Sequence, residues 1–132
     1  MGVLASIAGE PVGWCACGPR SRYLPPGGIG DRLLADRDRS EDDVVWLVPC
    51  FYLHPHHRSH GVSHALLDAA IATATAHQAA AVEAWPAVVP GLRWDAFRGR
   101  TELFSEAGFT QVARLESHRL GVQRVLLRLD LV

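Results

Sequence analysis

The sequence contains a strand-like segment followed by a glycine loop and then by an amphipathic stretch. This succession constrains the fold more than any other feature. Residues 44–53 are mostly hydrophobic, and the loop that follows them ends at Gly61. The apolar residues of the amphipathic stretch are Val62, Leu66, Leu67, Ala70, Ile71 and Ala74. Their spacing of about 3.6 residues predicts a helix packed on a sheet, so the chain is expected to be an α/β protein.

The start of this predicted helix is suited to binding an anion. No acidic residue precedes Asp68, so the free N–H groups and the positive end of the helix dipole are not neutralised. Gly61 lets the backbone approach a ligand closely, and Ser63 adds a hydroxyl donor. Arg58 and its neighbouring histidines favour negative charge at the same place. We therefore expect a pyrophosphate on this loop.

The loop resembles motif A of the GCN5-related N-acetyltransferases, whose signature is Arg/Gln-x-x-Gly-x-Gly/Ala after a hydrophobic strand. Arg58, Gly61 and Ser63 stand at the three signature positions, with Ser63 in place of the usual glycine or alanine. The resemblance implies that backbone amides of the loop bind the pyrophosphate of acetyl-coenzyme A, the expected co-substrate. The residues expected to bind it are Phe51, Tyr52, Leu53, Arg58, Ser59, His60, Gly61, Val62, Ser63, His64 and Phe104.

The rest of the chain follows the order of the same family, as represented by its bacterial members. Residues 9–16 resemble its second hairpin, and residues 80–85 form a short apolar strand. Residues 101–109 resemble its motif B, a short helix that ends at a glycine. Alternating patterns over 109–117 and 121–131 predict two final strands.

We expect one domain over residues 1–132, with a mixed, mostly antiparallel sheet flanked by helices. Strands 44–53 and 80–86 should run parallel and splay apart to admit the co-substrate. The family usually begins with a strand and two helices that form much of the acceptor wall, whereas this chain starts at the hairpin. Either the start codon is mis-assigned, the segment is lost, or another subunit supplies the wall. A homodimer is expected, since sheet and core surface would otherwise be exposed.

Residues 18–43 are the one irregular stretch, with a Pro-Pro-Gly-Gly sequence before a charged run from Asp31 to Asp43. This stretch is either a lid over the acceptor site or a solvated loop.

Composition excludes several classes of function. The 132 residues contain 13 basic and 14 acidic side chains, with a net charge of −1, so neither nucleic acid nor an anionic membrane is an expected partner. Neither a membrane-spanning run nor a signal peptide is recognisable, which predicts a cytoplasmic protein. The three cysteines, at positions 15, 17 and 50, are best explained as buried thiols.

Acetyl transfer to an amine requires a base that removes the amine proton. Glu83 is the first candidate, because it lies in an apolar strand beside the expected splay and burial would raise its pKa. The alternative for Glu83 is an exposed carboxylate at a strand edge. His54, at the end of the preceding strand, is the second candidate base or an ordinary turn residue.

The general acid is harder to identify. Many family members have a tyrosine on the motif B helix, and this chain has Phe104 at that position, which cannot donate a proton. Phe104 is instead expected to pack on the pantetheine arm. Tyr52 is the only nearby phenol, and its position alone does not make it the acid.

Two further sets of side chains have alternative interpretations. The histidines at 54, 56, 57, 60 and 64 could bind a metal, but no metal site is expected, because suitable thiols and carboxylates are not beside them. Trp46, Trp85 and Trp94 either line an acceptor pocket or belong to the core.

The sequence therefore predicts an acetyl-coenzyme A-dependent N-acetyltransferase that acts on a small-molecule amine. The alternative is a non-catalytic acyl-coenzyme A-binding or regulatory module, because the N-terminal wall and the tyrosine acid are missing.

Overall fold

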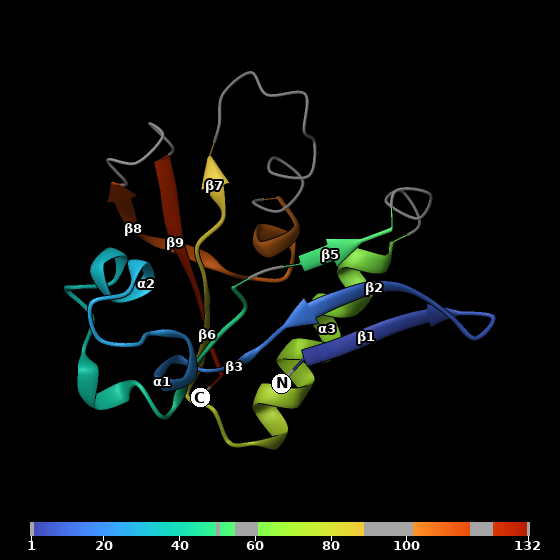
Figure 1. The fold of residues 1–132 in the computed structure, drawn as a ribbon, viewed down its shortest axis with the longest axis horizontal. Helices are drawn as coiled ribbons and strands as arrows, with labels where there is room; N and C mark the ends of the chain where they lie inside the picture. Colours follow the sequence, from blue (N-terminus) through green and yellow to red (C-terminus); the bar gives the residue numbers. More distant parts are fainter. Residues whose placement is uncertain (1, 50, 55–60, 89–101, 117–122, 132) are drawn as a thin grey trace.

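A computed structural model describes residues 2–49, 51–54, 61–88, 102–116 and 123–131 (Figure 1). The strands are β1 (Gly2–Ile7), β2 (Glu10–Ala16), β3 (Gly18–Pro19), β4 (Val45–Leu47), β5 (Phe51–Leu53), β6 (Ala81–Ala84), β7 (Ala87–Val88), β8 (Thr110–Glu116) and β9 (Gln123–Asp130). The helices are α1 (Arg20–Tyr23), α2 (Ile29–Leu33), the 3-10 helix η1 (Arg39–Glu41), α3 (Val62–Ala76) and a short helix at 102–106.

The strands form two hydrogen-bonded sheets, referred to below as the two parts of the sheet. One part has the strand order β1-β2-β5, and the other has the order β3-β4-β6-β9-β7 with β8 paired to β9. Among the described strand pairs, only β4 and β6 are parallel. This arrangement confirms the predicted mixed, mostly antiparallel sheet with flanking helices (Figure 1).

The single strand predicted over residues 44–53 is wrong, because this stretch forms two strands with different partners. β4 pairs with β6, and the Val48 N–H donates the last hydrogen bond to the Glu83 carbonyl, at 2.9 Å. Pro49 has no N–H and cannot continue the ladder. β5 then pairs with β2 instead. The predicted parallel pairing is therefore confirmed for β4 and β6 only, and it ends at Glu83, where the chain after β4 turns to pair with β2. We call this point the apex of the splay.

Helix α3 covers one face of the sheet and confirms the predicted helix. Its buried side chains are Val62, Leu66, Leu67, Ala70 and Ala74, as the apolar stripe predicted. They pack into one core with residues of β2, β4, β6 and β9 and with the short helix at 102–106. Gly108 ends that short helix with a φ of +97°, as expected for a C-terminal glycine.

Residues 18–43 cover part of the opposite face, so the solvated loop is the wrong interpretation. The segment folds into β3, α1, α2 and η1, and Figure 1 shows it beside the strands of the larger part of the sheet. Leu24 and Leu34 are buried with Leu47 and Leu115 of the sheet in a second, smaller core. A charged sequence thus forms a packed layer. None of the helices in the described ranges is long and apolar enough to span a membrane.

Candidate functional site

The N-terminus of α3 presents backbone donors without a side-chain cap. Gly61 is the N-cap residue, with a φ of +71° that favours glycine, and the first turn contains no acidic residue. Because the first helical bond runs from the Ala65 N–H to the Gly61 carbonyl, the preceding N–H groups have no partner within the helix. A Cβ built at Gly61 would meet no atom of the described residues within 4 Å, apart from its chain neighbours.

Part of the predicted anion loop lies outside the described residues. This applies to Arg58, Ser59 and His60, and to the histidines at 56 and 57. Of the remaining loop residues, Val62 is buried under the helix, whereas Ser63 is half-buried and His64 is exposed. The His64 Nε2 lies 3.5 Å from the Glu106 Oε2, which places the start of α3 beside the helix at 102–106.

β5 is the edge strand next to this loop. Phe51 and Leu53 pack against the core under α3, whereas Tyr52, on the other face, is 59% exposed. The His54 N–H donates to the Val12 carbonyl at 2.8 Å, so the alternation of an antiparallel ladder turns the backbone groups of Leu53 away from β2. Those groups face the side on which β5 diverges from β6, where an extended ligand arm can pair with them.

Phe104 is buried between two other phenylalanines of the core. Its side chain is 2% exposed, and its ring centroid lies 5.9 Å from that of Phe51 and 5.0 Å from that of Phe109. Phe51, which is half-buried, is the more exposed of the two neighbouring rings. Packing of Phe104 on the pantetheine arm stays a prediction.

Glu83 is buried in the face of the sheet opposite α3, so it is not an exposed edge carboxylate. Its residue exposure is 3%, and it accepts hydrogen bonds from two arginines. The Arg20 Nη1 donates to Oε1 at 3.0 Å, and the Arg128 Nη1 donates to Oε2 at 3.3 Å. A buried charge requires such partners. The sequence indicated the burial of Glu83 but not the two guanidinium groups.

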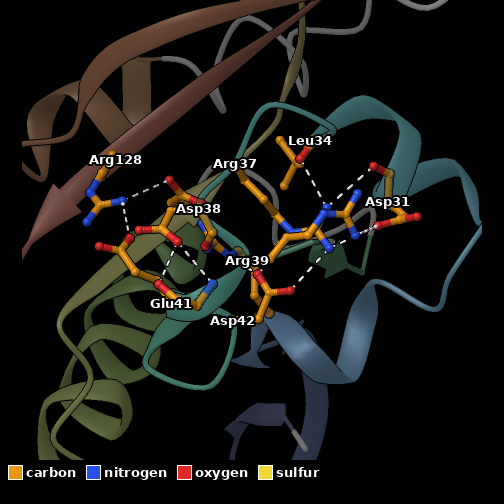
Figure 2. Close-up of polar contacts among 11 residues, drawn as sticks. Asp31, Leu34, Arg37, Asp38, Arg39, Glu41, Asp42 and Arg128 are labelled. Atoms are coloured by element: carbon orange, nitrogen blue, oxygen red, sulfur yellow. Dashed lines mark hydrogen bonds and ion pairs between the residues drawn. The ribbon is translucent and has the colours of Figure 1, made fainter.

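A wider network of charges joins Glu83 to the segment over residues 20–43. Arg20 also donates to the Asp42 Oδ1 at 2.9 Å, and Figure 2 shows Arg37 between Asp31 and Asp42. Burial acts to raise the pKa of the Asp42 carboxyl, but hydrogen bonds from Arg37 and Arg20 outweigh it and keep that pKa below its usual range. The hydrogen bond to Asp42 in turn raises the pKa of Arg37. These ions stay paired at neutral pH.

A cleft of about 480 Å³ lies between this segment and the sheet, with Glu83 among its lining residues. One wall comes from α2 to η1, and the other comes from β8 and β9. Glu83 is the last residue of β6 that pairs with β4, and its side chain also lines the cleft. The apex of the splay and the cleft therefore meet at Glu83. The predicted anion loop follows β5 in the chain.

The other predicted side chains lie in different surroundings. Trp46 is 3% exposed and its ring centroid is 5.2 Å from that of His77, which makes it a core residue. Trp85 packs partly buried against the smaller core, and Trp94 lies outside the described residues. His54 follows β5 and is half-buried. Within the described ranges, no three histidine, cysteine or acidic side chains gather as metal ligands would.

Comparison with solved structures identifies the fold. An acetyltransferase assigned to the GNAT family from Desulfovibrio desulfuricans superposes with a TM-score of 0.70 at 18% identity, over 99% of this chain and 68% of the other. YncA from Salmonella typhimurium, assigned as an acetyltransferase and solved with its cofactor acetyl-CoA, superposes with a TM-score of 0.69 at 16% identity. The match covers 98% of this chain and 63% of YncA. Ard1 from Thermoplasma volcanium superposes with a TM-score of 0.70 at 14% identity, over 99% of this chain and 70% of Ard1. The chain thus spans about two-thirds of the length of these proteins.

Sequence comparison carries the assignment further than the fold does. None of the curated protein sequences is significantly similar to the chain. The sequence model of the acetyltransferase (GNAT) family, however, matches residues 1–91, which include the splayed strands, the Gly61 loop and Glu83. The chain belongs to the GNAT family of acetyltransferases.

Proposed function

We propose that the chain transfers the acetyl group of acetyl-coenzyme A to the nitrogen of a small amine. The observation that carries the proposal is the divergence of β5 from β6 beside the uncapped start of α3. The pyrophosphate would accept hydrogen bonds from the backbone N–H groups after Gly61, together with Arg58, Ser59 and His60. The pantetheine arm would pair with the open edge of β5.

The thioester would then reach the apex of the splay, and the acceptor amine would come from the cleft. The amine nitrogen forms a bond to the thioester carbonyl carbon, the C–S bond breaks, and the coenzyme leaves as a thiolate. One proton leaves the amine and one proton returns to the thiolate. Positioning of the two reactants supplies most of the rate enhancement.

Glu83 is the proposed acceptor of the amine proton. Each oxygen of a carboxylate has more than one lone-pair site, so the bonds from Arg20 and Arg128 leave Glu83 able to accept a hydrogen bond from the amine. A proton passed to Glu83 would weaken both ion pairs, which opposes full transfer. If Glu83 does not take the proton, we propose that water or His54 removes it from the amine.

Replacing Gly61 by Asp tests the binding site. The substitution forces a side chain into the left-handed region and puts a negative charge where the pyrophosphate would lie. Calorimetry should show acetyl-coenzyme A binding lost by at least about 100-fold, which corresponds to roughly 3 kcal/mol. Gly27→Asp is the matched control, because Gly27 also has a positive φ with open space around it. Equal affinity in wild-type protein and Gly61→Asp would refute the site.

A further inference from the structure

β1 is an edge strand whose outer side has no partner among the described strands. It lies at one end of the order β1-β2-β5, and Figure 1 shows it on the outside of the β1–β2 hairpin. The strand at the other end, β5, is the edge proposed above for the co-substrate. The edge of β1 is thus left for a different partner.

The register of the ladders shows which backbone groups lie on this outer edge. The His54 N–H donates to the Val12 carbonyl, so alternation along β2 turns the backbone groups of Trp14 toward β5 as well. Leu4 is the β1 partner of Trp14, and its own N–H and C=O therefore point away from β2. The residues two positions before and after Leu4 follow the same alternation.

β1 lacks the features that protect an edge strand from pairing. Its sequence, GVLASI, contains neither a charged residue nor proline. The irregularity in its ladder is an extra residue of β2, Val12, so β1 itself stays regular. In contrast, β8 has an extra residue of its own at Val112 and the exposed charge of Arg114. A strand can therefore be added to β1 more readily than to β8.

Trp14 restricts what can lie opposite Gly2 in an added strand. A Cβ built at Gly2 would clash with the Trp14 Nε1, so the indole lies over this glycine. Trp14 is 40% exposed, and its indole N–H has no hydrogen-bond partner among the described residues. The added strand must therefore place a small residue opposite Gly2, and a side-chain acceptor there would satisfy the indole.

We infer that β1 of a second copy of the chain pairs with β1, antiparallel and about a two-fold axis at Leu4. Each Leu4 N–H would donate to the Leu4 carbonyl of the other copy, and Gly2 would lie opposite Ser6 of the other copy. Ser6 is small, and its hydroxyl oxygen can accept a hydrogen bond from the Trp14 indole. β1 thus meets by itself the requirement that Trp14 imposes on a partner.

The same pairing would cover apolar surface. Residues opposite each other in an antiparallel pair have their side chains on the same face, so the two Leu4 side chains would become neighbours. Leu4 is 62% exposed in the single chain. Each copy would therefore cover the Leu4 end of the other copy's exposed surface.

Hydrogen exchange on the wild-type chain tests this pairing. At a concentration where light scattering shows a dimer, the Leu4 amide proton should exchange roughly tenfold or more slowly than after dilution to the monomer. The Val3 amide is the internal control, because Val3 pairs with Cys15 inside the β1–β2 ladder and should be protected in both states. A dimer in which the Leu4 amide exchanges as fast as in the monomer would overturn the inference, and so would a chain that stays monomeric at micromolar concentration.

The variant Leu4→Pro tests the same edge by removing one N–H. Because that N–H points away from β2, the β1–β2 ladder should keep its hydrogen bonds, and circular dichroism should be unchanged. The dimer dissociation constant should rise by at least roughly tenfold, since each copy loses a donor to the other. Leu4→Ala is the matched control, because it removes the apolar side chain but keeps the N–H. Equal dissociation constants for the two variants would show that side chains alone hold the copies together, and this would overturn the edge pairing.

Discussion

The two parts of the sheet differ on the face that α3 does not cover. Over β4, β6, β8 and β9, the segment of residues 20–43 packs on the strands and is held by ion pairs (Figure 1). Over β1, β2 and β5, that face carries an exposed apolar row of Leu4, Trp14 and Tyr52, which are cross-strand neighbours with exposures of 62%, 40% and 59%.

This difference shows two ways of completing one sheet. The covered part buries Arg20 and Glu83 and depends on every ion in the network having a partner. The uncovered part has no such dependence and provides the edge strand on which the co-substrate would lie. We therefore expect substitutions in the covered part to affect stability and chemistry, and those in the uncovered part to affect association.

Replacing Arg20 by Leu should have the largest effect on stability. The substitution leaves Glu83 and Asp42 with one fewer buried cation, and breaking such a pair costs about 3–5 kcal/mol of unfolding free energy. Arg22→Leu is the control, because Arg22 is exposed in the same helix and should change stability by no more than about 0.5 kcal/mol. Urea denaturation measures both. A loss below about 1 kcal/mol for Arg20→Leu would show that the network does not hold this part of the fold.

Replacing Glu83 by Gln should lower amine-dependent thioester cleavage by roughly 10²- to 10⁴-fold, the usual contribution of a general base. The loss should shrink at high pH, where the amine is already neutral. Acetyl-coenzyme A affinity should be retained, since the phosphates would lie at the Gly61 loop.

The variant Arg128→Gln tests whether Glu83 acts as a base or only as a structural residue. It disturbs the same network but leaves the Glu83 carboxylate and its bond to Arg20. If both variants lose activity equally with the same pH profile, Glu83 acts only through the fold. An active wild type with an unaffected Glu83→Gln would transfer the base role to His54 or to water, whereas a wild type inactive with every amine would support the binding-module alternative.

The exposed row of Leu4, Trp14 and Tyr52 should give the smallest effect. We propose that a second copy of the chain covers this row in a symmetric dimer, which is the commonest assembly. Leu4→Arg should then raise the dimer dissociation constant by roughly tenfold with almost no change in melting temperature. Light scattering measures the mass. Val44→Arg is the control, because Val44 is exposed elsewhere. A wild-type monomer at micromolar concentration would contradict the dimer.

Much of the fold could be predicted from local pattern. The stripe from Val62 to Ala74 and the Gly61 and Gly108 signals act over a few residues, so the sequence contains them directly. The break at Pro49 was missed, because a hydrophobic run does not show where a strand changes partner. The helices between Gly18 and Asp43 were also missed, since their charges obscure the apolar spacing that anchors Leu24 and Leu34.

The site could be predicted only in part, for a related reason. Gly61 and Glu83 were identified from their positions beside strands. The ion pairs of Glu83 join residues that are 63 and 45 positions apart, and no spacing rule connects such partners. Only the folded chain brings Arg20, Glu83 and Arg128 together.

The change of partner after β4 has a consequence for how the molecule opens. Because β5 hydrogen-bonds to β2 and not to β6, the two parts of the sheet are separate ladders joined by side-chain packing under α3. Amide protons of the β1–β2 hairpin can therefore exchange with solvent through a local opening that leaves the ladder around β6 closed. A co-substrate lying between β5 and β6 would tie the two ladders into one cooperative unit. Its binding would slow exchange on both sides of the splay at once.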